Sequence, residues 1–364
     1  MNLHRLRTII GIELRQRARS VAWYVLLGVF AVILIGLLVL SFASFALWTG
    51  GNEWFFSIVI MLVLLLVLLV SPTLSGSAVN GDRDAATLAP VQVTLATTTE
   101  IVVGKFLAAW ISGLAFLVVA LPFLLVATFA GELNPLVIIS SLAILVIEVG
   151  IVAAIGVGLS AIVARSLFSV ASTYLIIAAL TIGTLLAFGL GATALRTTQE
   201  TVTRDYDVST VPPGCDPYGP VGAEGCPPIN ELGCTESSSL GDVPRFDRVW
   251  WLLAANPFVI LADATPPTYD DGYGAPSDLF SQIAYGVRMA QIPPEPQRVY
   301  DYCAQYYQEE QPPYETPEQQ IEGTTPSWFV GLLAQAVLAV GLMVWGIART
   351  RTPAKRLPPG TRIA

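Results

Sequence analysis

The sequence predicts an all-α polytopic membrane protein with six transmembrane helices, an N-terminal interfacial helix and a large extracytoplasmic insertion between the fifth and sixth helices. Hydrophobic residues make up 54% of the 364 positions and charged residues only 13%, whereas a soluble domain has about a quarter of its residues charged. Six apolar runs also reach the roughly 18 residues that a membrane crossing requires. They show no strict alternation of apolar and polar positions, so we expect helices rather than a β-barrel.

The six runs lie at approximately 21–47, 55–74, 104–129, 136–164, 167–190 and 328–347. Arg residues precede the first run and separate the fourth from the fifth, whereas Arg and Lys together separate the second from the third and follow the sixth. The opposite short loops, around 49–53 and 131–135, contain neither residue. The positive-inside rule therefore predicts a multi-pass protein of the cell (inner or plasma) membrane with both termini cytoplasmic. Five helices then occupy 21–195, the sixth occupies 327–348, and 349–364 is a basic cytoplasmic tail.

The N-terminal arm, 1–20, has an apolar helical face opposite a basic one. The apolar positions are Leu3, Leu6, Ile10 and Leu14, and the basic positions are Arg5, Arg15 and Arg19. This pattern is typical of an amphipathic helix that lies in the inner interface with its cations near anionic lipid. The alternative is a positively charged flank with no further role.

The segment 196–326 is predicted to lie outside the cell. It holds 20 of the 27 acidic residues and only 6 of the 19 basic residues. It also holds all four cysteines, Cys215, Cys226, Cys234 and Cys303, which indicates an oxidising compartment and two disulfides with three pairings open. Metal binding by the cysteines is the alternative, disfavoured because no CxxC pair occurs. Pro, Gly, Ser and acidic residues dominate 197–242 and 291–325, so we expect irregular, partly mobile loops there.

Between these loops, 249–264 is apolar but is interrupted by Asn256 and Pro257. It is too short to span the bilayer, so we expect a re-entrant hairpin of two short helices with Trp250 and Trp251 at the headgroup level. Residues 279–287 then show the spacing of a short amphipathic helix. The alternative is that both pieces form the core of a small outer domain.

The cytoplasmic loop at 80–104 is long enough for a short helix around 83–88. A solvated loop would leave the apolar residues Leu88, Val91, Val93 and Leu95 exposed, which favours docking onto a cytoplasmic partner.

The order of short motifs resembles the permease subunits of ABC-2 type ABC transporters. These motifs are Glu13-Leu14-Arg15, Asp82-Arg83-Asp84, Ala86-Thr87-Leu88 and Gly104-Lys105. Ala86 stands where the family usually has Gly, and a Thr-rich stretch at 97–99 replaces its usual Pro-Ser pair. The resemblance implies that the 80–104 loop forms a coupling helix that docks on a nucleotide-binding subunit. The residues implied in coupling are Glu13, Arg15, Asp82, Arg83, Asp84, Thr87, Leu88, Glu100 and Lys105.

The resemblance also implies an exporter driven by a pair of separate ATPase subunits, with a second permease copy or a homologous permease completing the path. This chain has no phosphate-binding G-x-x-x-x-G-K-[ST] motif, so we expect it not to be an enzyme and expect ATP and Mg²⁺ to bind the partner. No cofactor or metal is expected on this chain, because His4 is its single histidine. Its net charge of -8 argues against nucleic acid as a partner.

Glu148 lies near the middle of the fourth apolar run, beside Gly150, Gly156 and Gly158. Ionisable residues in this position are costly and are usually paired or functional. We expect a structural hydrogen bond to a neighbouring helix, with a role in the translocation path as the alternative. Two other functions stay open: an ion-coupled secondary transporter, disfavoured because Glu148 is the lone buried charge, and a membrane scaffold that displays the acidic outer domain to a partner.

Overall fold

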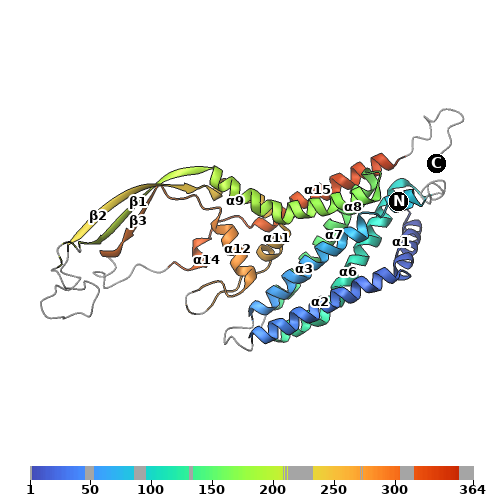
Figure 1. The fold of residues 1–364 in the computed structure, drawn as a ribbon, viewed down its shortest axis with the longest axis horizontal. Helices are drawn as coiled ribbons and strands as arrows, with labels where there is room; N and C mark the ends of the chain where they lie inside the picture. The colour runs from blue at the N-terminus through green and yellow to red at the C-terminus, as the bar shows by residue number, and fades with distance from the viewer. Residues whose placement is uncertain are drawn as a thin grey trace.

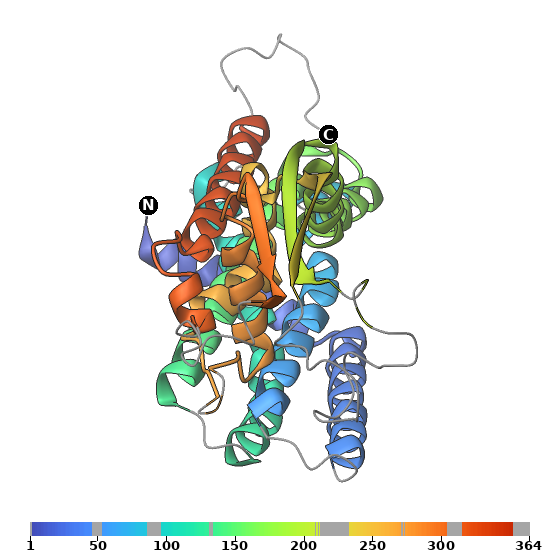
Figure 2. The same ribbon diagram turned by 90° about the vertical axis from the view of Figure 1, so that its left-hand side faces the viewer.

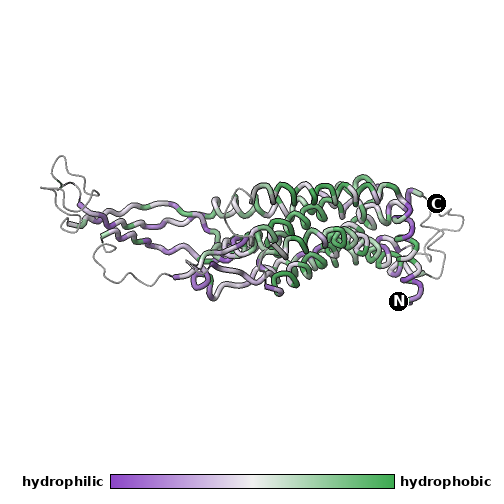
Figure 3. The backbone as a smooth tube through the Cα atoms, turned by 90° about the horizontal axis from the view of Figure 1, so that it is seen from below, coloured by the Kyte–Doolittle hydropathy of each residue, from purple (hydrophilic) through white to green (hydrophobic). Residues whose placement is uncertain are grey.

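The computed structural model describes residues 2–45, 53–85, 96–130, 134–207, 209, 211, 233–270, 272, 274–303 and 315–351. Within these residues, six helical segments are long and apolar enough to cross a membrane. The molecule is elongated, with a small β-sheet at one end and α1 (Leu3–Ala18) at the other (Figure 1). We call these the sheet end and the α1 end. Hydrophobic sequence follows the helices between them, and hydrophilic sequence gathers toward the two ends (Figure 3).

The six membrane-length segments match the six predicted runs. The first four are α2 (Val21–Phe45), α3 (Glu53–Ser75), α6 (Thr98–Ala130) and α7 (Pro135–Ile162). The fifth comprises α8 (Ser166–Ala178), a π-helical turn η1 (Ala179–Gly183) and α9 (Thr184–Ala194). The sixth is α15 (Ser327–Thr350).

Helix α7 forms the centre of the bundle. It begins with Asn134, whose side chain accepts from the Leu136 N–H at 3.0 Å, followed by Pro135 in the first turn, a favourable helix start. It packs against α3, α6, α8 and α15. Contact with α15 is close because both helices present glycine, and a Cβ on Gly346 would lie 2.9 Å from the Gly158 carbonyl oxygen.

At the α1 end, α1 packs along the first turns of α6. Gly104 allows this contact, since a Cβ there would lie 2.7 Å from Ile9 Cγ2. The loop after α3 contains α4 (Asn80–Asp84). The described helix therefore begins three residues before the expected position at 83–88, and 86–95 lie outside the described residues.

The sheet end corrects the all-α prediction. Strands β1 (Arg196–Tyr206), β2 (Cys234–Pro244) and β3 (Gln297–Asp301) form a sheet in the order β2-β1-β3 (Figure 2). Strand β1 pairs antiparallel with β2 over its whole length and parallel with β3. The expectation of irregular loops across 197–242 and 291–325 is wrong at these strands, because the β-branched Thr and Val residues of β1 favour an extended chain despite its polar composition.

The rest of the sequence between α9 and α15 packs on the bundle. Helices α10 (Trp250–Ala254), α11 (Pro257–Ala264) and α12 (Leu279–Met289) lie between β2 and β3 in the chain, and α14 (Pro317–Gln320) precedes α15. Helix α11 is buried against α7, α12 and α15. The apolar hairpin is therefore joined to the membrane-length helices rather than only to an outer domain.

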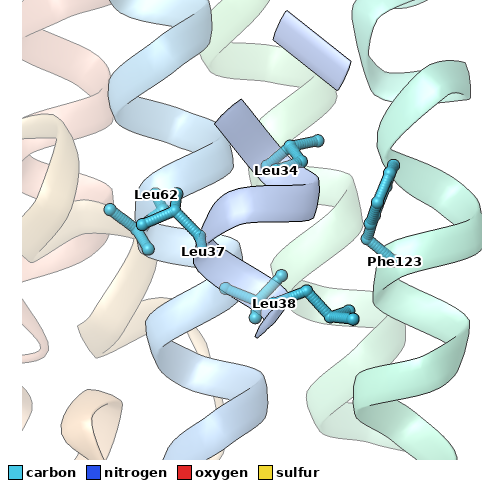
Figure 4. A pocket seen from close by; sticks show the side chains of 6 residues that line it. Leu34, Leu37, Leu38, Leu62 and Phe123 are labelled. Carbon is cyan, nitrogen blue, oxygen red and sulfur yellow. The ribbon is translucent and has the colours of Figure 1, made fainter. Parts of the chain in front are cut away.

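A small cavity of about 10 Å³ lies between α2, α3 and α6 (Figure 4). Its lining is apolar: Leu34, Leu37, Leu38, Val59, Leu62 and Phe123. This volume is close to that of a single water probe, and an apolar lining would leave a water without partners. We therefore interpret it as imperfect packing rather than a binding site.

Candidate functional site

Lys105 joins three elements at the α1 end. It lies in the second turn of α6 with only 3% of its side chain exposed. Its Nζ is 2.6 Å from Asp82 Oδ2 in α4 and also binds the Glu13 carboxylate of α1. A buried ammonium is stable only with such compensation, so one cation holds α1, α4 and α6 together.

Glu100 links the beginnings of α1 and α6. Its Oε2 accepts from the Thr97 N–H at 2.9 Å, while Thr97 Oγ1 accepts from the Glu100 N–H at 3.3 Å, which is the capping-box arrangement. Its Oε1 accepts from the Asn2 N–H at 2.6 Å. The Asn2 side chain in turn accepts from the His4 N–H at 3.0 Å. A carboxylate that the resemblance assigned to coupling therefore stabilises the start of two helices.

Arg17 is a part of this site that sequence reasoning missed. It donates to Ser112 Oγ at 2.8 Å, to the Leu74 carbonyl at 2.9 Å and to the Ala108 carbonyl at 3.3 Å. The Leu74 carbonyl lies in the last turn of α3, where helix carbonyls lack intrahelical partners. Burial lowers the pKa of Arg17, and the nearby Glu13 partly offsets this effect. The available signal was its spacing four residues after Glu13, which places both on one helical face.

Arg83 contacts α7 and α15. Its guanidinium donates to the Ala161 carbonyl at 3.1 Å and to Thr350 Oγ1 at 3.3 Å. Just before it, the N–H groups of Val79 and Asn80 donate to Ser160 Oγ at 2.9 and 3.1 Å. The beginning of the 80–104 loop is therefore part of the helix packing.

Two of the coupling residues are exposed. Arg15 and Asp84 lie at the surface, and neither has an ion pair or side-chain hydrogen bond within the part of the chain that the structure describes. Thr87 and Leu88 lie outside the described residues. Arg15 and Asp84 are thus the described motif side chains that a partner could contact without breaking an internal bond.

Glu148 has the most unusual environment in the membrane-length helices. Only 1% of the residue is exposed, and neither carboxylate oxygen has a hydrogen-bond partner among the described residues. The expected hydrogen bond to a neighbouring helix is therefore wrong. The neighbouring Gly150 accommodates the Trp110 ring, whose Nε1 donates to the Val146 carbonyl at 3.0 Å. Glu148 is therefore a costly buried group that no observed internal contact explains.

The hairpin turn lies at Asn256, which connects it to the fifth membrane-length segment. Asn256 Oδ1 accepts from the Phe258 N–H at 3.0 Å and starts α11, with Pro257 in its first turn. Its Nδ2 donates to the Thr181 carbonyl at 2.7 Å and to Thr184 Oγ1 at 3.0 Å. Thr181 belongs to the π-helical turn η1, a type of distortion that occurs often at functional sites.

The two tryptophans that precede the turn differ in their exposure. Trp251 is exposed, and its Nε1 donates to the Arg248 carbonyl, whereas Trp250 is half-buried.

Asp263 is a second residue that sequence reasoning missed. Its Oδ2 accepts from the Ser327 N–H, from Ser327 Oγ at 2.9 Å and from the Trp328 N–H at 3.0 Å. Its Oδ1 accepts from Arg288 Nε at 2.7 Å, and its side chain is fully buried. Asp263 thus caps α15 from another helix, since Pro326 at the N-cap position has no side-chain oxygen to do so. The sequence feature that could have identified Asp263 is its position as the single acidic residue in the apolar run of the hairpin.

The structure contains a disulfide between Cys234 and Cys303. It joins the first residue of β2 to the chain just beyond β3, so it links the two edge strands of the sheet covalently. Cys215 and Cys226 lie outside the described residues. No group of three or more His, Cys, Asp or Glu side chains within the described ranges could hold a metal ion.

No protein-family model matches this chain, and no curated protein matches it.

Proposed function

We propose that the chain is the membrane-spanning permease subunit of an ATP-driven ABC-2 type transporter that works as an exporter. The observation that carries the proposal is the binding of Lys105 to both Glu13 and Asp82. These residues come from three separate motifs, and they meet at the end of the bundle where the 80–104 loop begins. The α1 end is then the cytoplasmic end and the sheet end is outside.

The contacts at the α1 end suit the transmission of force. A nucleotide-binding subunit that pressed on the loop would move α4, and Lys105 would carry this movement to α1 and α6. Arg83 would carry it to α7 and α15 through its bonds to Ala161 and Thr350. ATP and Mg²⁺ would bind the partner. Nucleotide binding and hydrolysis there would shift the equilibrium between two arrangements of α1, α4 and α6.

In this proposal two permeases, either two copies or one copy and a homologous chain, enclose the translocation path. Glu148 is a candidate residue of that path, because a buried carboxyl without an internal partner is typical of a functional position in a membrane protein.

A membrane scaffold is the second candidate, and the disulfide-bonded sheet that extends from the bundle favours it. The contacts of Asp263 favour the transporter, because they attach the segment before α15 to the bundle core instead of leaving it as an independent domain. An ion-coupled transporter would use Glu148 as its ion site and would need no ATPase.

The test is to isolate the chain with its ATPase and to measure ATP hydrolysis and transport for Asp84→Arg combined with Arg15→Glu. Both side chains are exposed, so we expect an unchanged thermal stability of the chain but a loss of ATPase association. Arg7→Glu, an exposed substitution on the same helix, is the matched control and should retain association. Transport that continues without ATP and stops when the ion gradient is collapsed would contradict the proposal.

A further inference from the structure

A polar cavity of about 460 Å³ lies beside α12 and α14, just before α15 begins. This volume lies within the range of small-molecule sites. Its lining comes from the loop after α11, the last turn of α12, α14 and the segment that enters α15. The lining residues are Pro267, Tyr269, Arg288, Thr316, Glu318, Gln319, Ile321, Glu322, Gly323 and Thr324.

The cavity wall is held in place by hydrogen bonds within the chain. Helix α14 begins with a capping box between Thr316 and Gln319. The Tyr285 hydroxyl donates to Gln320 Oε1 at 2.6 Å and fixes the helix to α12. Gln291 and Thr325 are joined by two hydrogen bonds, of 2.8 and 2.9 Å. The cavity is therefore formed before any ligand binds, which lowers the entropic cost of binding.

Arg288 offers donors to this cavity. Its Nε donates to the buried Asp263 carboxylate, which orients the guanidinium. Its two terminal nitrogens have no hydrogen-bond acceptor within the described ranges, and 22% of the side chain is exposed. An Arg held in this way binds the oxygens of a phosphate or carboxylate group through its remaining N–H groups.

The opposite charge is also present in the lining. Glu318 and Glu322 are both exposed, and neither forms an ion pair in the described part of the chain. Burial and the nearby Glu318 carboxylate raise the pKa of Tyr269, while Arg288 opposes this rise. Tyr269, Arg288 and Glu318 all line the cavity. Because Asp263 already balances Arg288, the two glutamates leave the site with negative charge and favour a ligand that carries a cation.

We propose that this cavity binds a zwitterion that bears a phosphate and a primary ammonium, the chemistry of an ethanolamine phosphate group. Arg288 binds the phosphate, and Glu318 and Glu322 accept from the ammonium. A primary ammonium fits better than a quaternary one, because acceptors dominate the described lining and Tyr269 is the single aromatic residue among those described lining residues, whereas quaternary ammonium groups are usually bound by several aromatic rings. Thr324 lies three residues before the membrane-length helix α15 begins, so the source we favour is a phosphatidylethanolamine headgroup.

The test uses the purified full chain in detergent and measures lipid binding by native mass spectrometry. Wild type should bind phosphatidylethanolamine at least five-fold more tightly than phosphatidylcholine or phosphatidylglycerol. Glu318→Gln combined with Glu322→Gln should abolish this preference, and Glu315→Gln, an exposed acid outside the lining, should retain it. Equal binding of the three lipids by wild type, or a preference unchanged in the double variant, would overturn the proposal.

Water-soluble glycerophosphoethanolamine distinguishes the two sources of the same chemistry. Competition with the lipid at similar concentration would assign the site to a free zwitterion, and binding of the lipid alone would assign it to a headgroup. Both results support the proposed chemistry. If neither the lipid nor glycerophosphoethanolamine binds, the proposal is contradicted. The thermal unfolding temperature of each variant without ligand shows that the protein is folded. Tyr269→Phe serves as a second lining variant and should weaken binding about two- to three-fold.

Discussion

Gly331 of α15 packs directly against the Ala254 carbonyl at the turn of the hairpin. A Cβ at position 331 would lie 1.8 Å from the Ala254 oxygen and 2.9 Å from Ile260 Cγ1. One turn later, Gln335 Nε2 donates to the Ala255 carbonyl at 2.9 Å. Helix α15 and the α10–α11 turn therefore fit together as one unit.

Gly331→Ala should destabilise the chain, because its methyl group would have to displace a backbone carbonyl. We expect a loss of about 1–3 kcal/mol, the usual range for overpacking, measured as the unfolding free energy in mixed detergent. Gly341→Ala is the matched control, since no described residue lies within 4 Å of a Cβ at that position on the same helix. Equal stability of the two variants would show that the hairpin does not contact α15 as described.

Asp263→Ala should lower the free energy of unfolding more than Asp263→Asn does. The Ala variant leaves Arg288 without its buried partner, a loss of about 3–5 kcal/mol for a buried pair, and also removes the cap of α15. Asn retains an acceptor for the N–H groups of Ser327 and Trp328, so this variant should lose less stability. A double-mutant cycle of Asp263→Ala with Arg288→Leu measures the coupling, and strictly additive effects would contradict the pairing.

Lys105→Met should loosen the packing of α1 on α6, because Glu13 and Asp82 would be left without their shared cation. Trypsin cleavage at the arginines of α1 should then become at least several-fold faster in inverted membrane vesicles. Arg7→Gln, an exposed change on α1, should leave cleavage elsewhere in α1 unchanged. Cleavage of Lys105→Met at the wild-type rate would mean that the ion pairs do not hold α1.

Glu148→Leu should fold at least as well as wild type, because the substitution removes a buried polar group that has no hydrogen-bond partner among the described residues. If Glu148 belongs to the translocation path, both Glu148→Leu and Glu148→Gln should lower transport while complex yield stays normal. Reduced yield for Leu but not for Gln would instead reveal a hydrogen bond between helices.

Replacing Cys234 and Cys303 together by Ser should loosen the sheet but not the bundle. The disulfide closes a loop with a sequence separation of 69 residues, and such bonds typically stabilise by about 2–4 kcal/mol. Hydrogen exchange should therefore accelerate in β1 and β3 and stay unchanged in α7. Unchanged exchange in β1 would contradict this role.

The membrane-length helices were predictable because a bilayer imposes a length and a composition that the sequence shows directly. Strand β1 was not, since its Thr-rich sequence is stabilised by two neighbouring strands that lie far away in the chain. Strand pairing of this kind depends on tertiary context.

The candidate site was predictable only in part. The order of the motifs singled out Glu13, Asp82 and Lys105, but nothing local in the sequence indicated that Lys105 would bind both carboxylates. The roles of Arg17 and Asp263 depend on backbone groups of other helices. The sequence around each residue does not identify those partners. The prediction of a hydrogen bond for Glu148 was wrong, because a carboxyl group in an apolar run indicates an unusual position but does not identify the groups around it.

Site-specific photo-crosslinking from position 84 tests the proposal that an ATPase docks beside α4. Asp84 is exposed at the α1 end, and Glu295, an exposed residue near β3 at the sheet end, is the control position. The account predicts that a crosslinker at position 84 captures a protein with a G-x-x-x-x-G-K-[ST] motif and that the control does not. Capture of no such protein from membranes in which the chain is active in transport would contradict it.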